Sequence, residues 1–298
     1  MKLFSLFMLF GIDLKKMVRS IAALPGFFSD YKRLKAELAS DEGAMKIGRL
    51  YPVLLDKTDS SGTATGHYFH QDLLVAQKVF GSGADRVVDI GSRVDGFVAH
   101  VAAFRKIEVV DIRDLHSDHD NIDFLQCDFM DKGSTQQLGQ SDLVTCLHVL
   151  EHFGLGRYGD PIVTDGHIRG LRNLERLVSD GGRLIVSVPI GRPRIEFNAH
   201  RIFSSGALAS LISDDFALAD FAFVDDHGDL HTGVDLAAHQ AELDKMHFGC
   251  GIYDFRRTPP GGGQAIRGAG RAAGAEAGQP VLSRPDQTLR HPSEAGKI

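Results

Sequence analysis

Acidic residues at the ends of three predicted strands are the first sign of a ligand site. Asp89 precedes a glycine-containing turn at 91–96, Asp111 follows that turn by about 20 residues, and Asp128 ends the next apolar run. Such a turn lets a ligand approach the amides at a helix N-terminus. Asp111 can accept the two hydroxyls of a ribose, and Asp128 can meet an adenine amino group. Each aspartate alone would suit a helix cap or a loop, but three at one sheet edge favour a cofactor site.

A nicotinamide or flavin dinucleotide is the competing ligand for the turn. Its pyrophosphate must lie against bare backbone, and Arg93 stands where that fingerprint requires glycine. A cofactor without a pyrophosphate does not need this glycine. The turn therefore favours such a cofactor and leaves a nucleotide-dependent oxidoreductase as the weaker alternative.

Two histidines and a glutamate stand close to the same predicted edge. His148, Glu151 and His152 spell HxxEH, which on a helix directs both imidazoles at one zinc ion. Residues 142–147 instead predict a strand, where positions four apart are separated by roughly 13 Å, too far to share zinc. We therefore predict no metal site and a core position for His148 with a backbone partner. Glu151, His152 and, after the fifth strand, His200 are candidates for the substrate pocket, with a surface position as the alternative for the two histidines.

Short apolar strands that alternate with helices must position these residues. The predicted strands are 86–90, 106–112, 122–127, 142–150 and 183–188. Buried strands with crossover helices indicate a mostly parallel sheet covered on both faces. An antiparallel pair, 216–224 and 251–255, would close the sheet. The expected fold is therefore a doubly wound, Rossmann-like α/β sheet of seven strands, with the candidate site at its carboxyl edge.

The segments that flank this pattern differ from it in composition. We expect three parts, namely a helical extension (1–65), a folded domain (66–256) and a disordered tail (257–298). The extension predicts helices that break at Pro25-Gly26. Its apolar run at 3–12 is too short to span a bilayer. With the basic residues beside it, this segment suits peripheral contact with an anionic membrane surface, and packing on the domain is equally compatible.

Composition narrows the partners. The net charge of −6, without a block of lysine and arginine, disfavours nucleic acid as the main partner. Cys127, Cys146 and Cys250 lack CxxC spacing, so we expect buried, inert thiols in a reducing, cytoplasmic compartment.

Together these motifs resemble class I S-adenosylmethionine (SAM)-dependent methyltransferases, over about residues 65–255. The likeness rests on Asp89-x-Gly91, the acidic ends of the second and third strands, and the segments 147–152 and 181–189. Within that superfamily the chain resembles a family of unknown function that is often associated with surface-polysaccharide genes. The segments that carry this second likeness are 67–71, 88–96, 151–160 and 196–201.

The resemblance implies a role for each candidate residue. The methionine end of SAM would be framed by Asp89, Gly91 and Gly96, the ribose held by Asp111, and the adenine met by Asp128 and Phe129. The superfamily often has a glycine-rich turn where this chain has Arg93 and Asp95, so the path of the loop departs from the pattern.

The implied activity is in-line methyl transfer to a small-molecule or saccharide acceptor. A hydroxyl acceptor would need a general base, for which Glu151 or His152 is the first choice and His200 the second. A catalytically silent SAM-fold protein that acts as a binding or scaffold subunit is the alternative.

Overall fold

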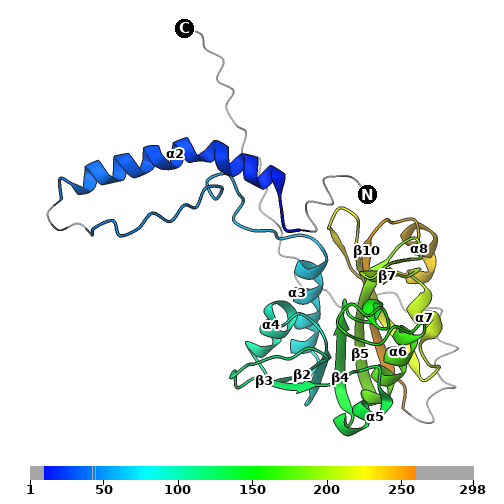
Figure 1. The fold of residues 1–298 in the computed structure, drawn as a ribbon. Helices are drawn as coiled ribbons and strands as arrows, with labels where there is room; N and C mark the ends of the chain where they lie inside the picture. The colour runs from blue at the N-terminus through cyan, green and yellow to red at the C-terminus, as the bar shows by residue number, and fades with distance from the viewer. Residues whose placement is uncertain (1–9, 42, 44, 260–298) are drawn as a thin grey trace, which may run out of the picture.

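The computed structural model describes residues 10–41, 43 and 45–259. An eight-stranded sheet forms its centre, in the order β3-β2-β1-β4-β5-β10-β8-β9 (Figure 1). The five strands from β3 to β5 run parallel, and β10, β8 and β9 then pair in antiparallel fashion. The predicted doubly wound, mostly parallel sheet is confirmed. It has eight strands instead of seven because a two-residue strand, β9, extends one edge.

The strands of the main sheet are β1 (Val87–Ile90), β2 (Ile107–Asp111), β3 (Ile122–Gln126), β4 (Ser141–Leu147), β5 (Val178–Ile190), β8 (Phe216–Val224), β9 (Leu230–His231) and β10 (Gly249–Arg257). A separate hairpin pairs β6 (Arg194–Glu196) with β7 (His200–Ile202). The order reverses at β1, which has β2 on one side and β4 on the other. In doubly wound sheets, ligands bind at the carboxyl edge beside this switch point.

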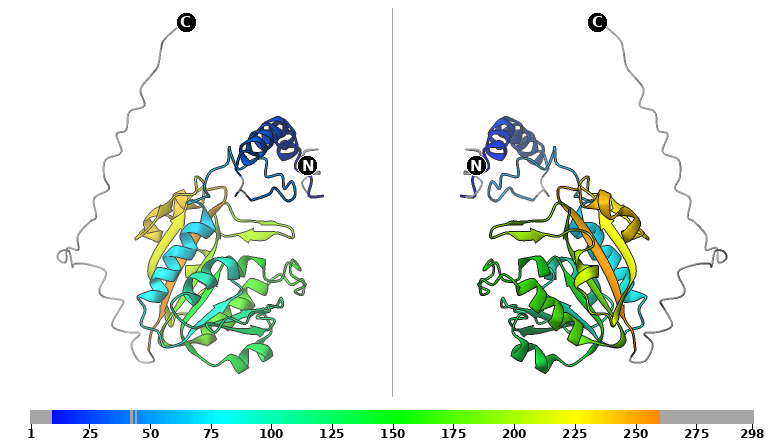
Figure 2. Two further views of the ribbon diagram at one scale, coloured as in Figure 1. Left: turned by 90° about the vertical axis from the view of Figure 1, so that its left-hand side faces the viewer. Right: turned by 90° about the vertical axis from the view of Figure 1, so that its right-hand side faces the viewer.

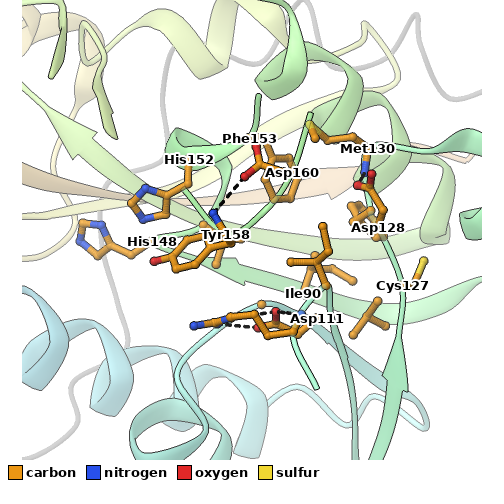
Figure 3. Close-up of a pocket in the computed structure, with 16 residues that line it drawn as sticks. Ile90, Asp111, Cys127, Asp128, Met130, His148, His152, Phe153, Tyr158 and Asp160 are labelled. Atoms are coloured by element: carbon orange, nitrogen blue, oxygen red, sulfur yellow. Dashed lines mark hydrogen bonds and ion pairs between the residues drawn. The ribbon is translucent and has the colours of Figure 1, made fainter. Parts of the chain in front are cut away.

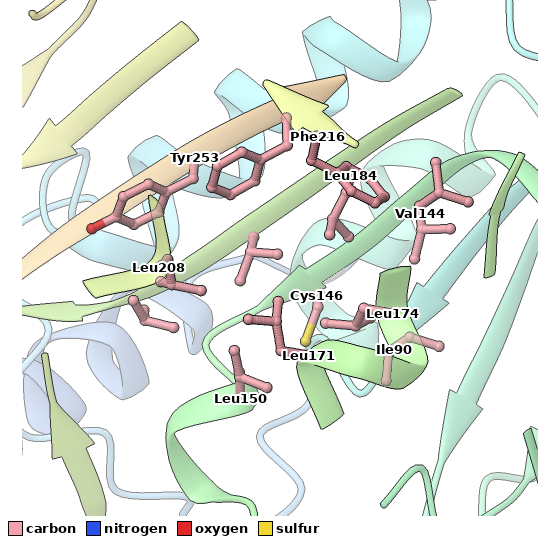
Figure 4. Close-up of a cluster of buried hydrophobic side chains, with 14 of the residues drawn as sticks. Ile90, Val144, Cys146, Leu150, Leu171, Leu174, Leu184, Leu208, Phe216 and Tyr253 are labelled. Atoms are coloured by element: carbon pink, nitrogen blue, oxygen red, sulfur yellow. The ribbon is translucent and has the colours of Figure 1, made fainter. Parts of the chain in front are cut away.

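Helices cover both faces of the sheet. They are α3 (His67–Phe80), a π-helical turn η1 (Val94–Val98), α4 (Ala99–Ala102), α5 (Lys132–Thr135), the short 3-10 turns η2 (Gln136–Leu138) and η3 (Leu150–His152), α6 (Gly166–Leu177), α7 (Ala207–Leu211) and α8 (Leu236–Leu243). Strand β4 shows how its alternating side chains serve two cores. Val144 and Cys146 pack on the α6 side (Figure 4), whereas Leu143 and Leu147 pack on the side of α3 and α4. The strands are therefore apolar on both faces, as a buried parallel sheet requires.

Two predicted boundaries are wrong. Strand β4 ends at Leu147, ahead of the predicted end at 150, because His148 has φ of 56°, the only positive φ of a non-glycine residue in the described part of the chain. Strand β5 begins at Val178, ahead of the predicted start at 183, because Val178 already pairs with Ser141 of β4.

The N-terminal helix, α2 (Leu14–Leu38), runs through Pro25 without a break, so the predicted interruption there is wrong. A proline removes one backbone hydrogen bond, which a helix of 25 residues tolerates. None of its residues is buried, so the structure gives no support to packing on the domain. Figure 1 shows it to one side of the sheet, where Arg19 pairs with Asp59 at 3.0 Å.

Some expectations about the chain ends concern residues that the structure does not describe. The predicted tail at 257–298 lies outside the described residues except for 257–259, where Arg257 is the last residue of β10, and most of the apolar run falls on the undescribed residues 1–9. Among the helices that are described, none combines the length and hydropathy needed to cross a membrane. The three-part division of the chain and the membrane contact stay predictions.

Candidate active site

A cavity opens at the carboxyl edge of β1, β2 and β4 (Figure 3). Its walls come from residues 90–91, 110–113, 127–130, 148–149, 152–153, 158 and 160. The position beside the β1–β4 switch point is the one at which this sheet topology binds ligands.

Gly91 forms the part of the cavity that follows β1. Its φ is +69°, and a Cβ atom there would lie 2.8 Å from Cγ1 of Val149. Its N–H donates to the carbonyl of Val110 at 2.8 Å. The turn after β1 can therefore pass this close to the loop after β4 only with glycine at this position.

Asp111, the last residue of β2, presents its carboxylate at one end of the cavity. Arg113 donates to it three times, from Nε at 3.0 Å, Nη2 at 2.6 Å and the backbone N–H at 2.8 Å. The ring of Tyr158 covers the guanidinium carbon of Arg113, with 4.6 Å to the ring centroid. A carboxylate offers about four acceptor positions, so Asp111 keeps capacity for a ligand hydroxyl.

The loop after β3 supplies a largely apolar wall. Phe129 and Met130 are buried there, and the ring of Phe129 lies 6.5 Å from that of Phe153. Oδ1 of Asp128 accepts from the N–H of Met130 at 2.9 Å, which fixes the turn. The predicted positions of Asp128 and Phe129 beside the cavity therefore agree with the structure, while their contacts to a cofactor stay predictions.

Asp89 does not line the cavity, in contrast to the role implied by the resemblance. It is fully buried and accepts from Oγ of Ser92 and Oγ1 of Thr145, both at 2.6 Å, and from the N–H of Ser92 at 3.0 Å. Burial raises the pKa of Asp89 to about 6. Its side chain therefore fixes the turn from behind, because its oxygens already have partners.

Gly96 also lies outside the cavity wall. A Cβ atom there would come within 2.4 Å of Oδ2 of Asp72 on α3. Glycine at this position therefore permits the close contact between η1 and α3. Gly96 does not line the cavity in which a cofactor would bind.

Arg93 does not line the cavity. Its guanidinium pairs with Asp95 at 2.8 Å and lies 5.1 Å from the ring centroid of Tyr68. Its side chain therefore does not itself block a pyrophosphate. The preference for a cofactor without a pyrophosphate, over a dinucleotide, must rest on the backbone of the turn.

His152 lies at the other end of the cavity, where its hydrogen bonds determine its tautomer. Its Nδ1 is 2.6 Å from the carbonyl oxygen of Ala199, and because a carbonyl only accepts, Nδ1 carries the proton. Nε2 then holds a lone pair and lies 3.7 Å from Oε1 of Glu151. Burial lowers the pKa of His152, so its imidazole is neutral near pH 7. It can therefore accept a proton.

Glu151 lies behind the cavity wall instead of lining it. The carboxylate is 1% exposed and accepts from Nδ1 of His148 at 2.7 Å. Burial is the largest single influence and disfavours its charge, but the attraction of His148 and His152 and the hydrogen bond from His148 together hold the pKa of Glu151 below its ordinary value. His148 lines the cavity, and its ring is held by this carboxylate and not, as predicted, by the backbone.

His200 is in a second layer and does not line the cavity. It lies on β7, with its ring centroid 6.5 Å from that of His152 and 4.9 Å from that of Phe248. Figure 2 shows its hairpin projecting over the loops that follow the parallel strands. The hairpin thus brings His200 near His152 without direct access to the cavity.

Sequence reasoning missed the residues that close the cavity. Oδ2 of Asp160 accepts from the N–H groups of Gly154 and Gly156, at 2.8 and 3.2 Å, and this folds the loop that carries Tyr158 over Arg113. The glycine-rich composition of this loop was the available signal. It could not show which side chains turn inward.

The chain was compared with family models, curated proteins and solved structures. The model of the family described as "Caenorhabditis protein of unknown function, DUF268" matches residues 97–248. No curated protein matches the sequence significantly.

Similar solved structures share little sequence with the chain. The N-methyltransferase NodS from Bradyrhizobium japonicum, in complex with S-adenosyl-L-homocysteine, is 14% identical, with a TM-score of 0.43 over 76% of this chain and 97% of that one. The 1,6-didemethyltoxoflavin N1-methyltransferase from Burkholderia thailandensis is 15% identical, with a TM-score of 0.46 over 80% and 88%. The [4+2]-cyclase SpnF is 16% identical, with a TM-score of 0.45 over 64% and 80%. Likeness at this level carries no information on substrate or reaction.

Proposed function

The chain belongs to the DUF268 family, and we propose that it is a SAM-dependent methyltransferase that acts on a hydroxyl group of a small molecule or saccharide. One observation carries the proposal. The cavity at the switch point has an aspartate at the end of β2 on one side and a neutral, proton-accepting histidine, His152, on the other. A ribose-bearing methyl donor and a hydroxyl acceptor need these two groups.

The residues of the cavity fit the donor. Asp111 would accept ribose hydroxyls, Phe129 and its neighbours would contact the adenine, and Asp128 would lie near the adenine amino group. The bare backbone at Gly91 would leave room for the methionine part. When bound there, SAM would supply an electrophilic methyl group. Asp89 and Gly96 would act indirectly, by fixing the turn and its packing on α3.

His152 is our choice for the general base. Its Nε2 would take the proton from the acceptor hydroxyl as the oxygen gains the methyl group. The carbonyl of Ala199 holds the ring, and the Glu151 carboxylate at 3.7 Å would stabilise the imidazolium that forms. Glu151 is thus proposed to stabilise charge, because its buried carboxylate already accepts from His148.

The surroundings of His152 support a polyhydroxylated acceptor. The ring of Tyr158 lines the cavity beside His152, with 5.4 Å between the two ring centroids. Aromatic rings with a polar edge offer an apolar face together with hydrogen-bonding groups. Such a lining suits a sugar, in line with the association with polysaccharide genes that the resemblance implies.

Turnover of the donor tests this function. The full chain would be incubated with methyl-labelled SAM and a panel of sugars, nucleotide sugars and small hydroxylated molecules. We expect S-adenosylhomocysteine to form and label to enter at least one acceptor. Binding of SAM without transfer to any acceptor would instead support a catalytically silent binding protein. Reduction of a nicotinamide cofactor would support the oxidoreductase alternative.

A further inference from the structure

Three potential metal ligands from distant segments converge beside the cavity. They are His67 at the start of α3, His148 directly after β4, and Cys250 near the start of β10. One nitrogen of each ring and the sulfur all lie within 4.8 Å of one another. The topology explains this meeting. Because β10 runs antiparallel to β5, it begins at the edge where the parallel strands end, and α3 begins at the same edge (Figure 1).

His148 has a buried nitrogen without a partner. Its side chain is 4% exposed and its Nδ1 bonds to Glu151, while Nε2 has no hydrogen-bond partner. Leaving a buried polar atom unpaired costs about 1–3 kcal/mol. Because Nδ1 donates to Glu151, a divalent cation would bind at Nε2 by displacing a proton from that nitrogen. The backbone also takes its unusual positive φ at this residue.

His67 offers a second imidazole, and the backbone of Phe248 hydrogen-bonds its ring. Its ring stacks on that of His148, with centroids 5.2 Å apart. One of the two rings must therefore rotate slightly for both lone pairs to meet a single ion.

Cys250 completes the set as the sulfur ligand. It is fully buried and forms no disulfide, and its hydrogen bonds to Oε1 of Gln71 and to the carbonyl of Gly251 are long, at 3.8 and 4.0 Å. A thiolate here and the Glu151 carboxylate next to His148 would together balance the charge of a divalent cation.

We propose that His67, His148 and Cys250 bind one divalent transition-metal ion, with zinc preferred. Zinc binds imidazole at about 2.0–2.1 Å and thiolate at about 2.3 Å, so donors in a tetrahedral site lie roughly 3.3–3.8 Å apart, a modest contraction from the present distances. Both histidines have the outer hydrogen bond that orients metal-bound imidazoles, to Glu151 and to the backbone of Phe248. Three protein ligands leave a fourth position for water or a ligand, as in catalytic zinc sites.

This site differs from the HxxEH site that the sequence argued against. His152 is not a ligand, because its Nδ1 is bonded to Ala199. Two ligands come from segments that lie 81 residues before and 102 residues after His148. The inference does not depend on methyl transfer.

Cys250 and His148 also allow another interpretation, since a thiol beside an imidazole held by a carboxylate is the arrangement of a nucleophile and its base. A nucleophile must meet its substrate, however, and Cys250 is fully buried. That arrangement also gives His67 no role. The metal site therefore accounts for more of the structure.

Metal binding by the full chain tests the proposal. After chelation and dialysis, the protein would be titrated with Zn²⁺, and separately with Co²⁺ while absorption is recorded. We expect one equivalent to bind, with tetrahedral cobalt bands and a thiolate-to-cobalt charge-transfer band. Cys250→Ser should abolish the charge-transfer band, and His67→Gln should abolish tight binding. Cys146→Ser, which removes another buried thiol, should change neither. Glu151→Gln should weaken zinc binding about 10–100-fold.

The cobalt spectrum of the wild-type chain keeps the test decisive when a variant does not fold. Absence of stoichiometric binding by the folded wild-type chain would overturn the proposal. So would a charge-transfer band that survives in Cys250→Ser. Rapid alkylation of Cys250 without metal binding would overturn it in favour of the nucleophile.

Discussion

The two ends of the cavity are built in opposite ways. At the donor end, Asp111 is paired with Arg113, two residues along the chain, and this pair is partly exposed, with 53% exposure for the arginine side chain and 14% for the aspartate. At the histidine end, the Glu151–His148 pair is buried, and its neighbours His67 and Cys250 come from distant segments. Exposed ion pairs contribute only about 0–1 kcal/mol, whereas removal of one partner from a buried pair costs about 3–5 kcal/mol. The donor end therefore depends on contacts between near neighbours in the chain, while the histidine end depends on buried contacts between distant segments.

His152 should give the largest effect, because it is the proposed base at the histidine end. His152→Gln keeps a donor for the Ala199 carbonyl but cannot take a proton. Turnover should fall about 10²–10⁴-fold, with SAM affinity nearly unchanged. His116→Gln is the matched control, since its side chain is 94% exposed.

The pH–rate profile sharpens this prediction. A base works only when deprotonated, so the wild-type rate should rise with pH around a midpoint below the ordinary histidine value, because burial lowers the pKa of His152. The variant should lose this rising limb. Full activity of His152→Gln would exclude the histidine as base.

Gly91 tests the backbone of the donor end. Gly91→Ala would combine about 1–2 kcal/mol for the left-handed backbone with about 1–3 kcal/mol for overpacking against Val149. Gly181→Ala is the control, because its φ is also positive (+76°) and a Cβ there would meet nothing within 4 Å. Denaturant unfolding should therefore show a loss of about 2–5 kcal/mol for the first and about 1–2 kcal/mol for the second. Equal losses would show that the contact with Val149 is unimportant.

The pH dependence of stability should show the smallest effect, with opposite signs for two groups outside the cavity wall, His167 on α6 and Asp89 on β1. Burial and the charge of Arg201 lower the pKa of His167 to about 4. Its contribution to the free energy of unfolding is therefore complete above about pH 6.5 and is lost as the pH falls towards 4. Burial raises the pKa of Asp89 to about 6. Its contribution to the free energy of unfolding is therefore complete below about pH 3.8 and is lost as the pH rises through 6.

Substitutions should separate these two contributions. Between pH 4 and 6.5, the rise of the unfolding free energy with pH should be shallower in His167→Gln and steeper in Asp89→Asn than in the wild type. Denaturant titrations in the presence of a chelator would measure the slopes. Slopes that move in the same direction in both variants would contradict the assignment.

The same contrast explains what the sequence could predict. Gly91, Asp111 and Asp128 stand at strand ends, and because parallel strands end at one edge, periodicity alone placed them together at the cavity. Tyr158 and Arg113 meet through loop hydrogen bonds, which have no periodic signal. The convergence of His67 with Cys250 depends on the direction of β10 and the packing of α3, and local patterns contain neither.

Two further differences have the same origin. Asp89 has the predicted position after β1, but whether its carboxylate faces the ligand or the turn depends on Ser92 and Thr145, the latter 56 residues away. Pro25 predicted a break from local chemistry, yet a long helix tolerates the loss of one hydrogen bond. Strand-end position is thus predictable, and side-chain direction is not.

Calorimetric titration with SAM tests the central claim, that this cavity holds the methyl donor, most directly. We predict that the wild-type chain binds SAM at one site per chain and that Asp111→Ala weakens binding by about 1.5–3 kcal/mol, or roughly 10- to 150-fold, because a hydrogen-bonding charged group is lost. Asp123→Ala removes an exposed carboxylate that lies on β3 and pairs with Lys106, and this variant should bind SAM like the wild type. Absence of SAM binding by the folded wild-type chain, or unchanged affinity in a folded Asp111→Ala variant, would contradict the account.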